Sequence, residues 1–347
     1  MIITHKIQEQ FAKNLIVWQL KHGRHNLPWQ NRHDVYHVWV SEIMLQQTQV
    51  HTVTKYYQNF IDQFPTIQHL ARASEDQVLH LWSGLGYYRR AKNLHLTAKV
   101  VVDQYNGNFP SDLEELMKLP GIGRSTAGAI RSLAFKLPTA ILDGNVKRVV
   151  KRYFNLTHDT KDDDKTLWPI VNQLVPEMNA HIYTQAQMDL GAMICIKKEP
   201  KCNLCPLKES CQYTHLEQTK STKSTVKEES YYFLVIFKEN SVWLTKRPEH
   251  GIWANLYTFP MFKDSASMNT WLNQLNVQII PVKGEQYKHR LTHRLLHLKT
   301  YLCHGDLLPD LTHLPGVWYK DQSFGLPKPV TDIIQKVIHD PTQSTLF

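Results

Sequence analysis

The sequence predicts two domains, an all-α domain followed by an α+β domain, with a polar linker between them. Apolar residues before the linker recur at helical spacing, whereas those after it form short β-rich runs. The linker, HLEQTKSTKSTVKEES (215–230), has few large apolar side chains and is rich in Lys, Ser and Thr. A chain of 347 residues is long enough to give each domain its own core. We therefore expect domains at 1–214 and 231–347.

The first domain contains two clear amphipathic stripes. Residues that share one helical face occur in two groups: Tyr36, Trp39, Val40, Ile43 and Met44, and Val146, Val149, Val150, Tyr153 and Phe154. Glu42 lies off the first stripe, so its side chain is free to face a cleft instead of the core. A carboxylate on a solvated helix face would show the same spacing.

The second domain combines strands with one helix near its end. YYFLVIF (231–237) and SVWLTKR (241–247) are typical of strands, and PVTDIIQKVIHD (329–340) has helical periodicity. The histidines that recur every four residues (His289, His293 and His297) would form a metal-binding face only on a helix, which the β-rich surroundings disfavour.

Four of the five cysteines lie close together, at Cys195, Cys202, Cys205 and Cys211, and their spacing, Cys-x6-Cys-x2-Cys-x5-Cys, predicts one metal site. Four thiolates need a cation, and zinc or an iron–sulfur cluster would serve equally well. The alternatives are a redox pair at 202 and 205 or unrelated buried thiols. Cys303 reads as a single packed thiol.

The charge balance favours a nucleic-acid partner. Lys and Arg number 40 against 31 Asp and Glu, for a net charge of +9, and most of the excess lies in residues 1–214. Lys198 is one of three lysines between the first two cysteines, so a metal would hold a basic loop rigid beside a phosphate backbone. No signal peptide or membrane-spanning apolar run is visible. We therefore expect a cytoplasmic, nucleoid-associated protein with no membrane partner.

Residues 119–130, LPGIGRSTAGAI, read as a helix end, a tight turn and a new helix start. Gly121 and Gly123 would allow positive φ and a close backbone approach, so the N–H groups of the next helix could cradle a phosphate. An ordinary helix–turn–helix connection is the alternative. Further along, Asp143 precedes an amphipathic helix, where a simple N-cap is the commonest use of Asp.

Five motifs in order resemble the helix-hairpin-helix DNA glycosylases, and among them the adenine DNA glycosylases of the MutY type. The motifs are SEIMLQQTQV (41–50), LWSGLGYYRRAKNLH (81–95), LPGIGRSTAGAI (119–130), ILDGNVKRV (141–149) and QMDLGAMIC (187–195). The resemblance runs from about Leu27 to Cys211. It implies a helix-hairpin-helix domain whose loop 195–211 holds one [4Fe-4S] cluster.

The same resemblance implies a reaction, the removal of adenine mispaired with 8-oxoguanine or guanine. Cleavage of an N-glycosidic bond needs an acid for the leaving base and a carboxylate near the developing sugar cation. The resemblance assigns Glu42 as the acid that protonates adenine N7 and Asp143 as that carboxylate. Because Glu42 must stay protonated near neutral pH, we expect burial and the charge of Asp143 to raise its pKa.

DNA-contacting positions are also implied by the resemblance. Gln47, Leu85 and Tyr87 match positions that wedge into the duplex around the opposing purine, although Tyr87 would be an ordinary core aromatic in an unrelated protein. Gln30 and Gln185 match positions near the adenine pocket. Lys147 would contact a phosphate or lie on a solvated helix face.

Ser125 bears on whether the DNA strand is cut. Relatives of the endonuclease III type carry a Lys at this hairpin position, whose amine forms a Schiff base with the sugar. A serine cannot form that imine. The sequence thus predicts base excision with little or no strand cleavage.

The second domain resembles the Nudix-like module of the same glycosylases, chiefly through RPEHGIWANLYTFP (247–260). It lacks the Glu-rich helix with which Nudix hydrolases hold metal. In the family, a Phe-Ser-His loop touches 8-oxoguanine, and the corresponding residues here are Leu291, Thr292 and His293. Thr292 keeps a hydroxyl, whereas Leu291 lacks the aromatic face.

A second class of function fits part of the sequence. A non-catalytic DNA-binding protein with a redox-sensing cluster would explain the cysteines and the basic charge, but it would need neither Glu42 nor Asp143. The presence of both acids in motif context favours the enzyme. We expect a monomer that acts on duplex DNA containing adenine opposite 8-oxoguanine or guanine, and the linker is a candidate docking site for repair or replication proteins.

Overall fold

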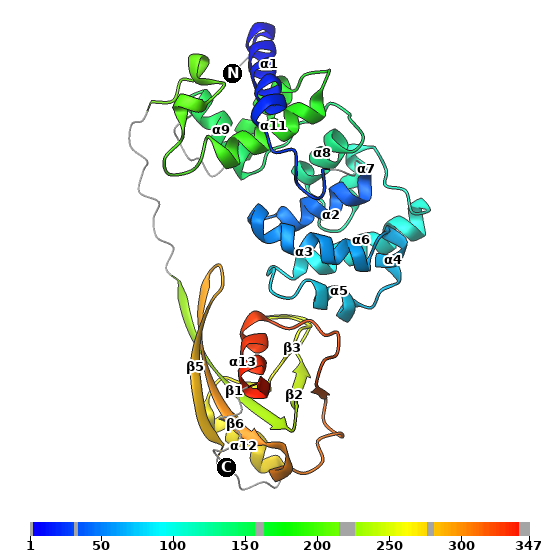
Figure 1. The fold of residues 1–347 in the computed structure, drawn as a ribbon, viewed down its shortest axis with the longest axis vertical. Coiled ribbons are helices and arrows are strands. Elements are labelled where there is room, and N and C mark those ends of the chain that lie inside the picture. The colour runs from blue at the N-terminus through cyan, green and yellow to red at the C-terminus, as the bar shows by residue number, and fades with distance from the viewer. Residues whose placement is uncertain (1–2, 31–33, 157–162, 215–225, 276–280, 340–347) are drawn as a thin grey trace. The chain divides into compact units, whose positions relative to one another are not determined.

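The structure is a computed structural model that describes residues 3–30, 34–156, 163–214, 226–275 and 281–339. It divides into two compact units, one formed by residues 1–72 and 92–219 and the other by residues 73–91 and 220–347 (Figure 1). Residues 73–91 precede most of the helical domain in sequence and nevertheless pack with the C-terminal residues.

The first unit is built from helices, which confirms the predicted all-α domain. Its helices are α1 (His5–His22), α2 (Val35–Leu45), α3 (Val50–Gln63), α4 (Ile67–Arg72), α6 (Arg89–Tyr105, which begins in the second unit), α7 (Leu113–Lys118), α8 (Arg124–Leu133), α9 (Gly144–Tyr153), α10 (Asp163–Leu174) and α11 (Ala180–Met193). Two short 3-10 turns, Cys202–Leu204 and Lys208–Ser210, shape the cysteine loop. No helix in the described part of the chain is long and apolar enough to cross a bilayer.

Side-chain caps fix where several helices begin. Asp34 accepts a hydrogen bond from the His37 N–H (3.0 Å) before α2, and Asp143 accepts from the N–H groups of Asn145 (3.0 Å) and Val146 (2.7 Å) before α9. The N-cap alternative for Asp143 is therefore part of the structure. It does not exclude a second role, because a cap uses only part of the accepting capacity of a carboxylate.

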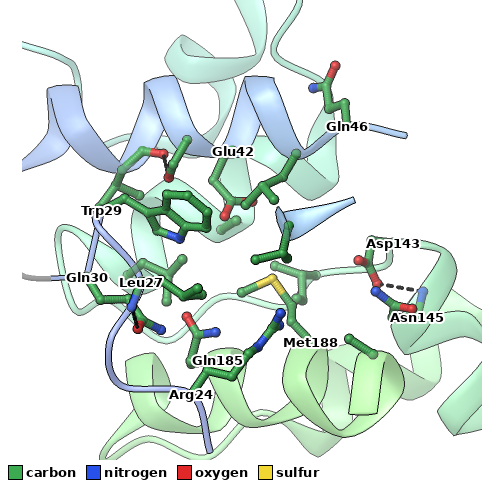
Figure 2. Close-up of a pocket in the computed structure, with 18 of the residues that line it drawn as sticks. Arg24, Leu27, Trp29, Gln30, Glu42, Gln46, Asp143, Asn145, Gln185 and Met188 are labelled. Atoms are coloured by element: carbon green, nitrogen blue, oxygen red, sulfur yellow. Dashed lines mark hydrogen bonds between the residues drawn. The ribbon is translucent and has the colours of Figure 1, made fainter. Parts of the chain in front are cut away.

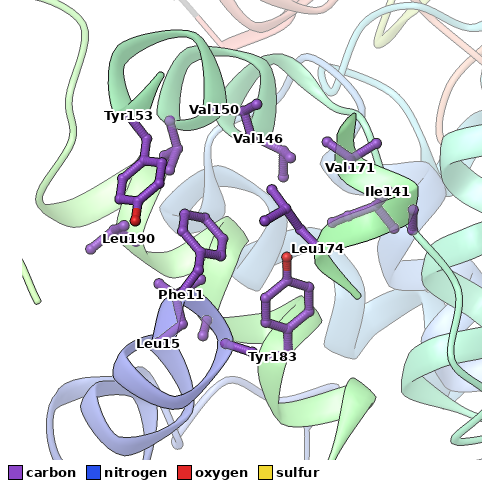
Figure 3. Close-up of a cluster of buried hydrophobic side chains, with 14 of the residues drawn as sticks. Phe11, Leu15, Ile141, Val146, Val150, Tyr153, Val171, Leu174, Tyr183 and Leu190 are labelled. Carbon is purple, nitrogen blue, oxygen red and sulfur yellow. The ribbon is translucent and has the colours of Figure 1, made fainter. Parts of the chain in front are cut away.

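The core that supports α9 is apolar and tightly packed (Figure 3). Phe11 of α1 is fully buried, and its ring meets that of Tyr153 edge to face, with centroids 4.8 Å apart. Both predicted amphipathic stripes are buried along their whole length. The apolar face of α9 is thereby fixed by α1, α10 and α11, which sets the direction in which its first turn points.

The second unit contains a mixed sheet with helices, in agreement with the predicted α+β domain. Its elements are α5 (Glu75–Leu81), β1 (Lys227–Lys238), β2 (Ser241–Lys246), β3 (Tyr257–Thr258), β4 (Met261–Phe262), α12 (Ser265–Gln274), β5 (Val282–Arg290), β6 (Arg294–His304), β7 (Val317–Tyr319) and α13 (Lys328–His339). The sheet order is β3-β2-β1-β6-β5, with β4 paired to β1 and β7 to β2. The pair β1 and β6 is parallel, and the other strand pairs are antiparallel.

The structure bears on the predicted linker and on the spaced histidines. Strand β1 begins at Lys227, inside the segment expected to be a linker, while residues 215–225 lie outside the described ranges. His289 lies on β5 and His297 on β6, so the four-residue recurrence of histidines does not form a helical face.

Candidate active site

A pocket of about 1270 Å³ opens in the first unit (Figure 2). Its walls come from α2, the first turn of α9, α8, α11 and the chain that follows α1. Its apolar lining includes Leu27, Trp29 and Met188, and its polar lining includes Arg24, Gln30, Glu42, Asp143 and Gln185. A mostly apolar hollow with a few convergent polar groups is the usual form of a small-molecule or base-binding site.

Glu42 lies on the face of α2 that borders the pocket, as its spacing predicts. Burial, and secondarily the negative charge of Asp143, raise the pKa of Glu42 to about 7. This carboxyl group therefore retains its proton up to neutral pH. A protonated acid in a pocket can donate to a leaving group, whereas an ordinary surface glutamate is ionised there.

Asp143 comes from the turn before α9, and its side chain borders the same pocket (Figure 2). Burial raises its pKa, while the N–H groups of Val146 and Asn145 oppose the rise because they stabilise the charged form. The two acids thus differ in environment. Asp143 accepts hydrogen bonds from a helix N-terminus, which favours a carboxylate, and Glu42 is the group held neutral.

Arg148 links the first turn of α9 to the start of the cysteine loop. Its guanidinium donates to the carbonyl oxygens of Cys195 (2.7 Å) and Gly191 (2.6 Å) and to the side-chain oxygen of Asn145 (2.8 Å). Asn145 in turn donates its backbone N–H to Asp143. A continuous set of hydrogen bonds therefore runs from the cysteine loop to the carboxylate in the pocket.

A buried carboxylate that sequence reasoning missed organises another wall of the pocket. Asp189 has 0% exposure and accepts hydrogen bonds from Gln19 Nε2 (3.0 Å), from Arg24 N and Nε (both 2.8 Å) and from Gln185 Nε2 (2.9 Å). The charge of Arg24 compensates the buried carboxylate. The motif 187–195 contains Asp189, four residues after Gln185, and that helical spacing was the available signal.

Three other polar residues predicted to have a function also line the pocket. Gln30 accepts a hydrogen bond from Leu27 N–H (3.1 Å), and Gln47, an exposed residue with φ of 57°, lies on the rim. Ser125 also lines the pocket, and its hydroxyl accepts a hydrogen bond from Leu142 N–H (3.0 Å). That contact fixes the backbone directly before Asp143.

The two hairpin glycines differ, and one expectation was wrong. Gly121 has φ of 79°, as a tight turn requires, but Gly123 is extended, with φ of −87° and ψ of 172°, and it caps α8. No atom lies within 4 Å of the point where a Cβ on Gly123 would sit. Gly123 therefore leaves open space before the N–H groups of α8 and does not supply positive φ.

The expected wedge residues do not all lie at the surface. In the second unit, Tyr87 is 46% exposed with φ of 50°, whereas Leu85 is buried, with 6% exposure. As placed here, Leu85 supports the loop and does not present its side chain to a duplex. The hydroxyl of Tyr87 lies 3.0 Å from that of Thr292, so two residues assigned to the same purine meet.

The remaining residues predicted to contact DNA lie in different parts of the chain. His293 is exposed, and its carbonyl oxygen accepts from Lys227 N–H (3.2 Å). Lys147 forms an ion pair with Asp164. Lys198 lies in the cysteine loop, with an exposed side chain.

The four clustered cysteines are free thiols, each partly buried. Burial, and to a lesser degree the charges of Cys195, Cys211 and Cys202, raise the pKa of Cys205 to about 11. Their mutual influence indicates that the four thiols face one region. Among the described residues, no three His, Cys, Asp or Glu side chains form a group that could hold a single metal ion.

The comparisons with known proteins agree with the geometry. Residues 40–173 match the HhH-GPD superfamily of base excision DNA repair proteins, and residues 231–336 match the NUDIX domain. The chain is 40% identical to the adenine DNA glycosylase of Buchnera aphidicola subsp. Baizongia pistaciae, over 94% of this chain and 96% of that protein. It is 32% identical to the human adenine DNA glycosylase, over 90% of this chain and 71% of that protein.

Solved structures share the fold of the helical part. A thermostable thymine-DNA glycosylase superposes with a TM-score of 0.56 and 28% identity, covering 60% of this chain and 96% of that one. Endonuclease III trapped covalently on DNA superposes with a TM-score of 0.51 and 23% identity, covering 61% of this chain and 97% of that one. At that identity, the second likeness concerns the fold alone.

The raised pKa of Glu42 predicts a pH-dependent stability that Glu42→Gln should remove. The carboxyl titrates near pH 4.5 when unfolded and near pH 7 when folded. Between these values, the folded chain keeps a proton that the unfolded chain releases, so the free energy of unfolding falls as pH rises and levels off above about 7. The free energy of unfolding of the variant minus that of the parent should therefore increase by about 2 to 3 kcal/mol from pH 4.5 to pH 8.

Urea unfolding at several pH values measures this difference. Glu9→Gln is the matched control, because Glu9 is exposed on α1 and its replacement should leave the pH profile of the parent unchanged. A constant difference between Glu42→Gln and the parent at every pH would contradict the raised pKa.

Proposed function

The chain belongs to the adenine DNA glycosylases of the HhH-GPD superfamily, enzymes of base excision repair that excise adenine, and from that premise we propose that its substrate is adenine mispaired with 8-oxoguanine or guanine in duplex DNA. One observation carries the proposal: a protonated Glu42 and an N–H-capped Asp143 border the same pocket. Bond cleavage between a base and deoxyribose needs this pair of unequal acids.

We propose that Glu42 gives its proton to N7 of the flipped adenine. Protonation turns the base into a neutral leaving group, and the glycosidic electron pair departs with it. General acid catalysis contributes on the order of 10² to 10⁴ in rate. Once ionised, the same carboxylate can take a proton from the water that completes hydrolysis.

Asp143 is proposed to stabilise the sugar as its bond to adenine breaks. The oxocarbenium-like sugar carries a positive charge, and a fixed carboxylate in a pocket of low dielectric stabilises that charge without having to reorganise. The cap to Asn145 and Val146 holds the carboxylate in place before the substrate arrives. Arg148 keeps Asn145 itself in position.

Access to the pocket requires the adenine nucleotide to leave the duplex, at a cost of a few kcal/mol in lost stacking and pairing. We propose that exposed Tyr87 and Gln47 fill the space around the opposing purine. The hairpin with Gly121 and Gly123 offers N–H groups to a phosphate, and the space in front of Gly123 suits close approach. Lys147 and Lys198 add positive charge for the backbone.

The C-terminal domain is proposed to recognise the base opposite adenine. Helix α12 (Ser265–Gln274) contains no carboxylate, so it lacks the metal-binding acids that a Nudix hydrolase needs. Thr292 lies beside Tyr87 and offers a hydroxyl as donor and acceptor to an oxidised purine. We propose that the enzyme acts as a monomer. Because its proposed substrate is duplex DNA, we place it at the nucleoid.

One [4Fe-4S] cluster is the proposed cofactor, held by Cys195, Cys202, Cys205 and Cys211. Burial and the neighbouring thiols raise the pKa of Cys205 and Cys211, so these thiols need a cation to ionise near neutral pH. The four-cysteine spacing in a chain of this family favours a cluster with one iron for each thiolate over zinc. When bound, the cluster would neutralise the thiolates and fix residues 195–211 as a rigid loop.

Arg152 strengthens the link between that loop and α9. Its guanidinium donates to the carbonyl oxygens of Ile196 (2.7 Å) and Lys197 (2.9 Å), and one of its nitrogens lies 3.4 Å from Cys195 Sγ. These contacts fix the start of the cysteine loop against α9. The loop also presents its lysines from a fixed backbone.

Glu42→Gln should abolish adenine release, because the amide has no proton to give to N7. We expect the single-turnover rate on a duplex with adenine opposite 8-oxoguanine to fall by about 10² to 10⁴, while binding of that duplex stays within threefold of the parent. For the parent, the rate should also fall as pH rises above about 7, where Glu42 ionises. Glu9→Gln should behave as the parent, and near-parental turnover by Glu42→Gln would reject the assigned role.

The parent should release adenine without forming a covalent imine, because Ser125 has no amine. Borohydride reduction during turnover should trap no stoichiometric protein–DNA adduct, whereas a relative with Lys at this position supplies the positive control. A stoichiometric adduct together with strand cleavage would contradict the monofunctional proposal.

The purified chain should contain four irons and absorb broadly in the visible range, which elemental analysis and spectroscopy can measure. Cys202→Ala should lose iron and weaken the hydrogen-exchange protection of α9 through the contacts of Arg148 and Arg152. Cys303→Ala, at a buried thiol of the second unit, should keep all four irons. One zinc per chain in place of iron would overturn the cluster proposal.

A further inference from the structure

Residues 83–88, here called the wedge loop, connect α5 to α6 and have an unusual backbone. Gly84, Gly86 and Tyr87 have φ values of 94°, 78° and 50°. For Tyr87, the left-handed region costs roughly 1 to 2 kcal/mol, so this shape persists only where surrounding contacts hold it.

Part of that support comes from the residues that directly flank the wedge loop. The carbonyl oxygen of Gly86 accepts hydrogen bonds from Trp82 Nε1 (3.0 Å) and Arg90 Nη2 (3.1 Å). The Arg90 guanidinium lies 5.4 Å from the ring centroids of both Trp82 and Tyr87. These contacts fix the base of the wedge loop.

The rest of the support comes from residues 324–326, which precede α13 and lie more than 230 positions away in sequence. Leu326 N–H donates to Ser83 Oγ (3.0 Å), and the hydroxyl of Tyr88 donates to Leu326 O (3.0 Å). The same hydroxyl accepts from Gly84 N–H (3.1 Å). His80 Nδ1, just before the loop, lies 3.1 Å from Phe324 O.

Residues 324–326 are themselves fixed to the sheet. Gly325 O accepts from Tyr257 N–H (2.9 Å), and the Phe324 ring stacks on the Tyr257 ring with centroids 4.3 Å apart. A Cβ on Gly325 would lie 2.6 Å from Leu79 Cβ and 3.2 Å from the Leu79 carbonyl carbon. Any larger residue at 325 would therefore push this segment away from α5.

We propose that residues 324–326 are a positioning element that holds the wedge loop in the shape that presents Tyr87. The effect of this positioning on excision rests on the proposed function, in which the wedge loop enters the duplex. C-terminal residues would thus serve adenine excision in two ways, by recognising the opposing purine and by setting the backbone of the loop that displaces adenine. None of residues 324–326 needs to touch DNA for this second role.

Hydrogen exchange of the DNA-free full-length chain tests the positioning directly. In Gly325→Val, the amides of Ser83, Gly84 and Leu85 should exchange at least tenfold faster than in the parent, because their hydrogen-bonded loop loses its outer support. Amides of α9, in the first unit, should keep parental protection.

Gly284→Val is the matched control. Gly284 lies on β5 of the same unit, and a Cβ there would meet Thr300 Oγ1 at 2.5 Å, so the substitution crowds the unit without touching residues 324–326. This variant should leave exchange in the wedge loop unchanged. Parental exchange of the loop in Gly325→Val, or equal acceleration in both variants, would overturn the proposal.

A milder pair of variants decides the question if Gly325→Val fails to fold. Ser83→Ala and Tyr88→Phe each remove one hydrogen bond to Leu326 and keep the volume of the side chain nearly constant. Because Tyr88→Phe also removes the acceptor of the Gly84 N–H, the amide to follow is that of Leu85, which bonds to Trp82 O. The double variant should accelerate exchange of the Leu85 amide at least tenfold, and Tyr56→Phe, a partly exposed tyrosine of α3, should not. Parental loop exchange in the double variant would reject the positioning role.

Adenine release then separates this proposal from the proposed function. On a duplex with adenine opposite 8-oxoguanine, the single-turnover rate of Gly325→Val should fall at least tenfold, with Gly284→Val within threefold of the parent. A parental rate in a variant whose loop exchanges faster would refute the role in excision. If the parent itself releases no adenine, the proposed function fails, and loop exchange alone decides whether residues 324–326 position the loop.

Discussion

The site depends on the close approach of helices around the start of α9, where two glycine positions have no room for a larger residue. A Cβ on Gly191 of α11 would lie 2.5 Å from Asn145 Cβ, and one on Gly128 of α8 would lie 2.2 Å from Ala140 O. Two glycines therefore let α8 and α11 pack directly against the backbone that carries Asp143. Packing from both sides fixes this backbone, and the hydrogen bonds from Asn145 and Val146 orient the carboxylate, which is the preorganisation that the proposed electrostatic stabilisation requires.

The two acids that border the pocket lie in different surroundings. Glu42 is buried beside a negative charge, so its neutral form is favoured, whereas Asp143 receives two backbone N–H groups at a helix start. The hydrogen bonds to Asp143 oppose the effect of burial on its pKa, and Glu42 is the acid that the pocket holds neutral. A third buried carboxylate, Asp189, is paired with Arg24, which compensates its charge, and it holds neighbouring residues in place.

The proposed functions of excision and of recognition belong to different compact units. The pocket belongs to the first unit, whereas the wedge loop packs with the C-terminal residues, although it precedes most of the helical domain in sequence. The segment 73–91 therefore has covalent continuity with the catalytic helices and packing contacts with the sheet. If the wedge loop enters the duplex as proposed, this single segment would couple the opposing base to the displacement of adenine, because both events would involve the same loop.

The sequence alone determined what local chemistry controls: helices from apolar spacing, the cap at Asp143, the cysteine motif, and Glu42 on the face of α2 away from the core. It also predicted the α+β character of the second domain. Only the tertiary structure decided that Leu85 is buried, that Asp189 braces Gln185, and that residues 324–326 support the wedge loop. The reason is physical: spacing and capping act within a few residues and can be read from the letters, whereas contacts between residues hundreds of positions apart depend on how whole elements pack.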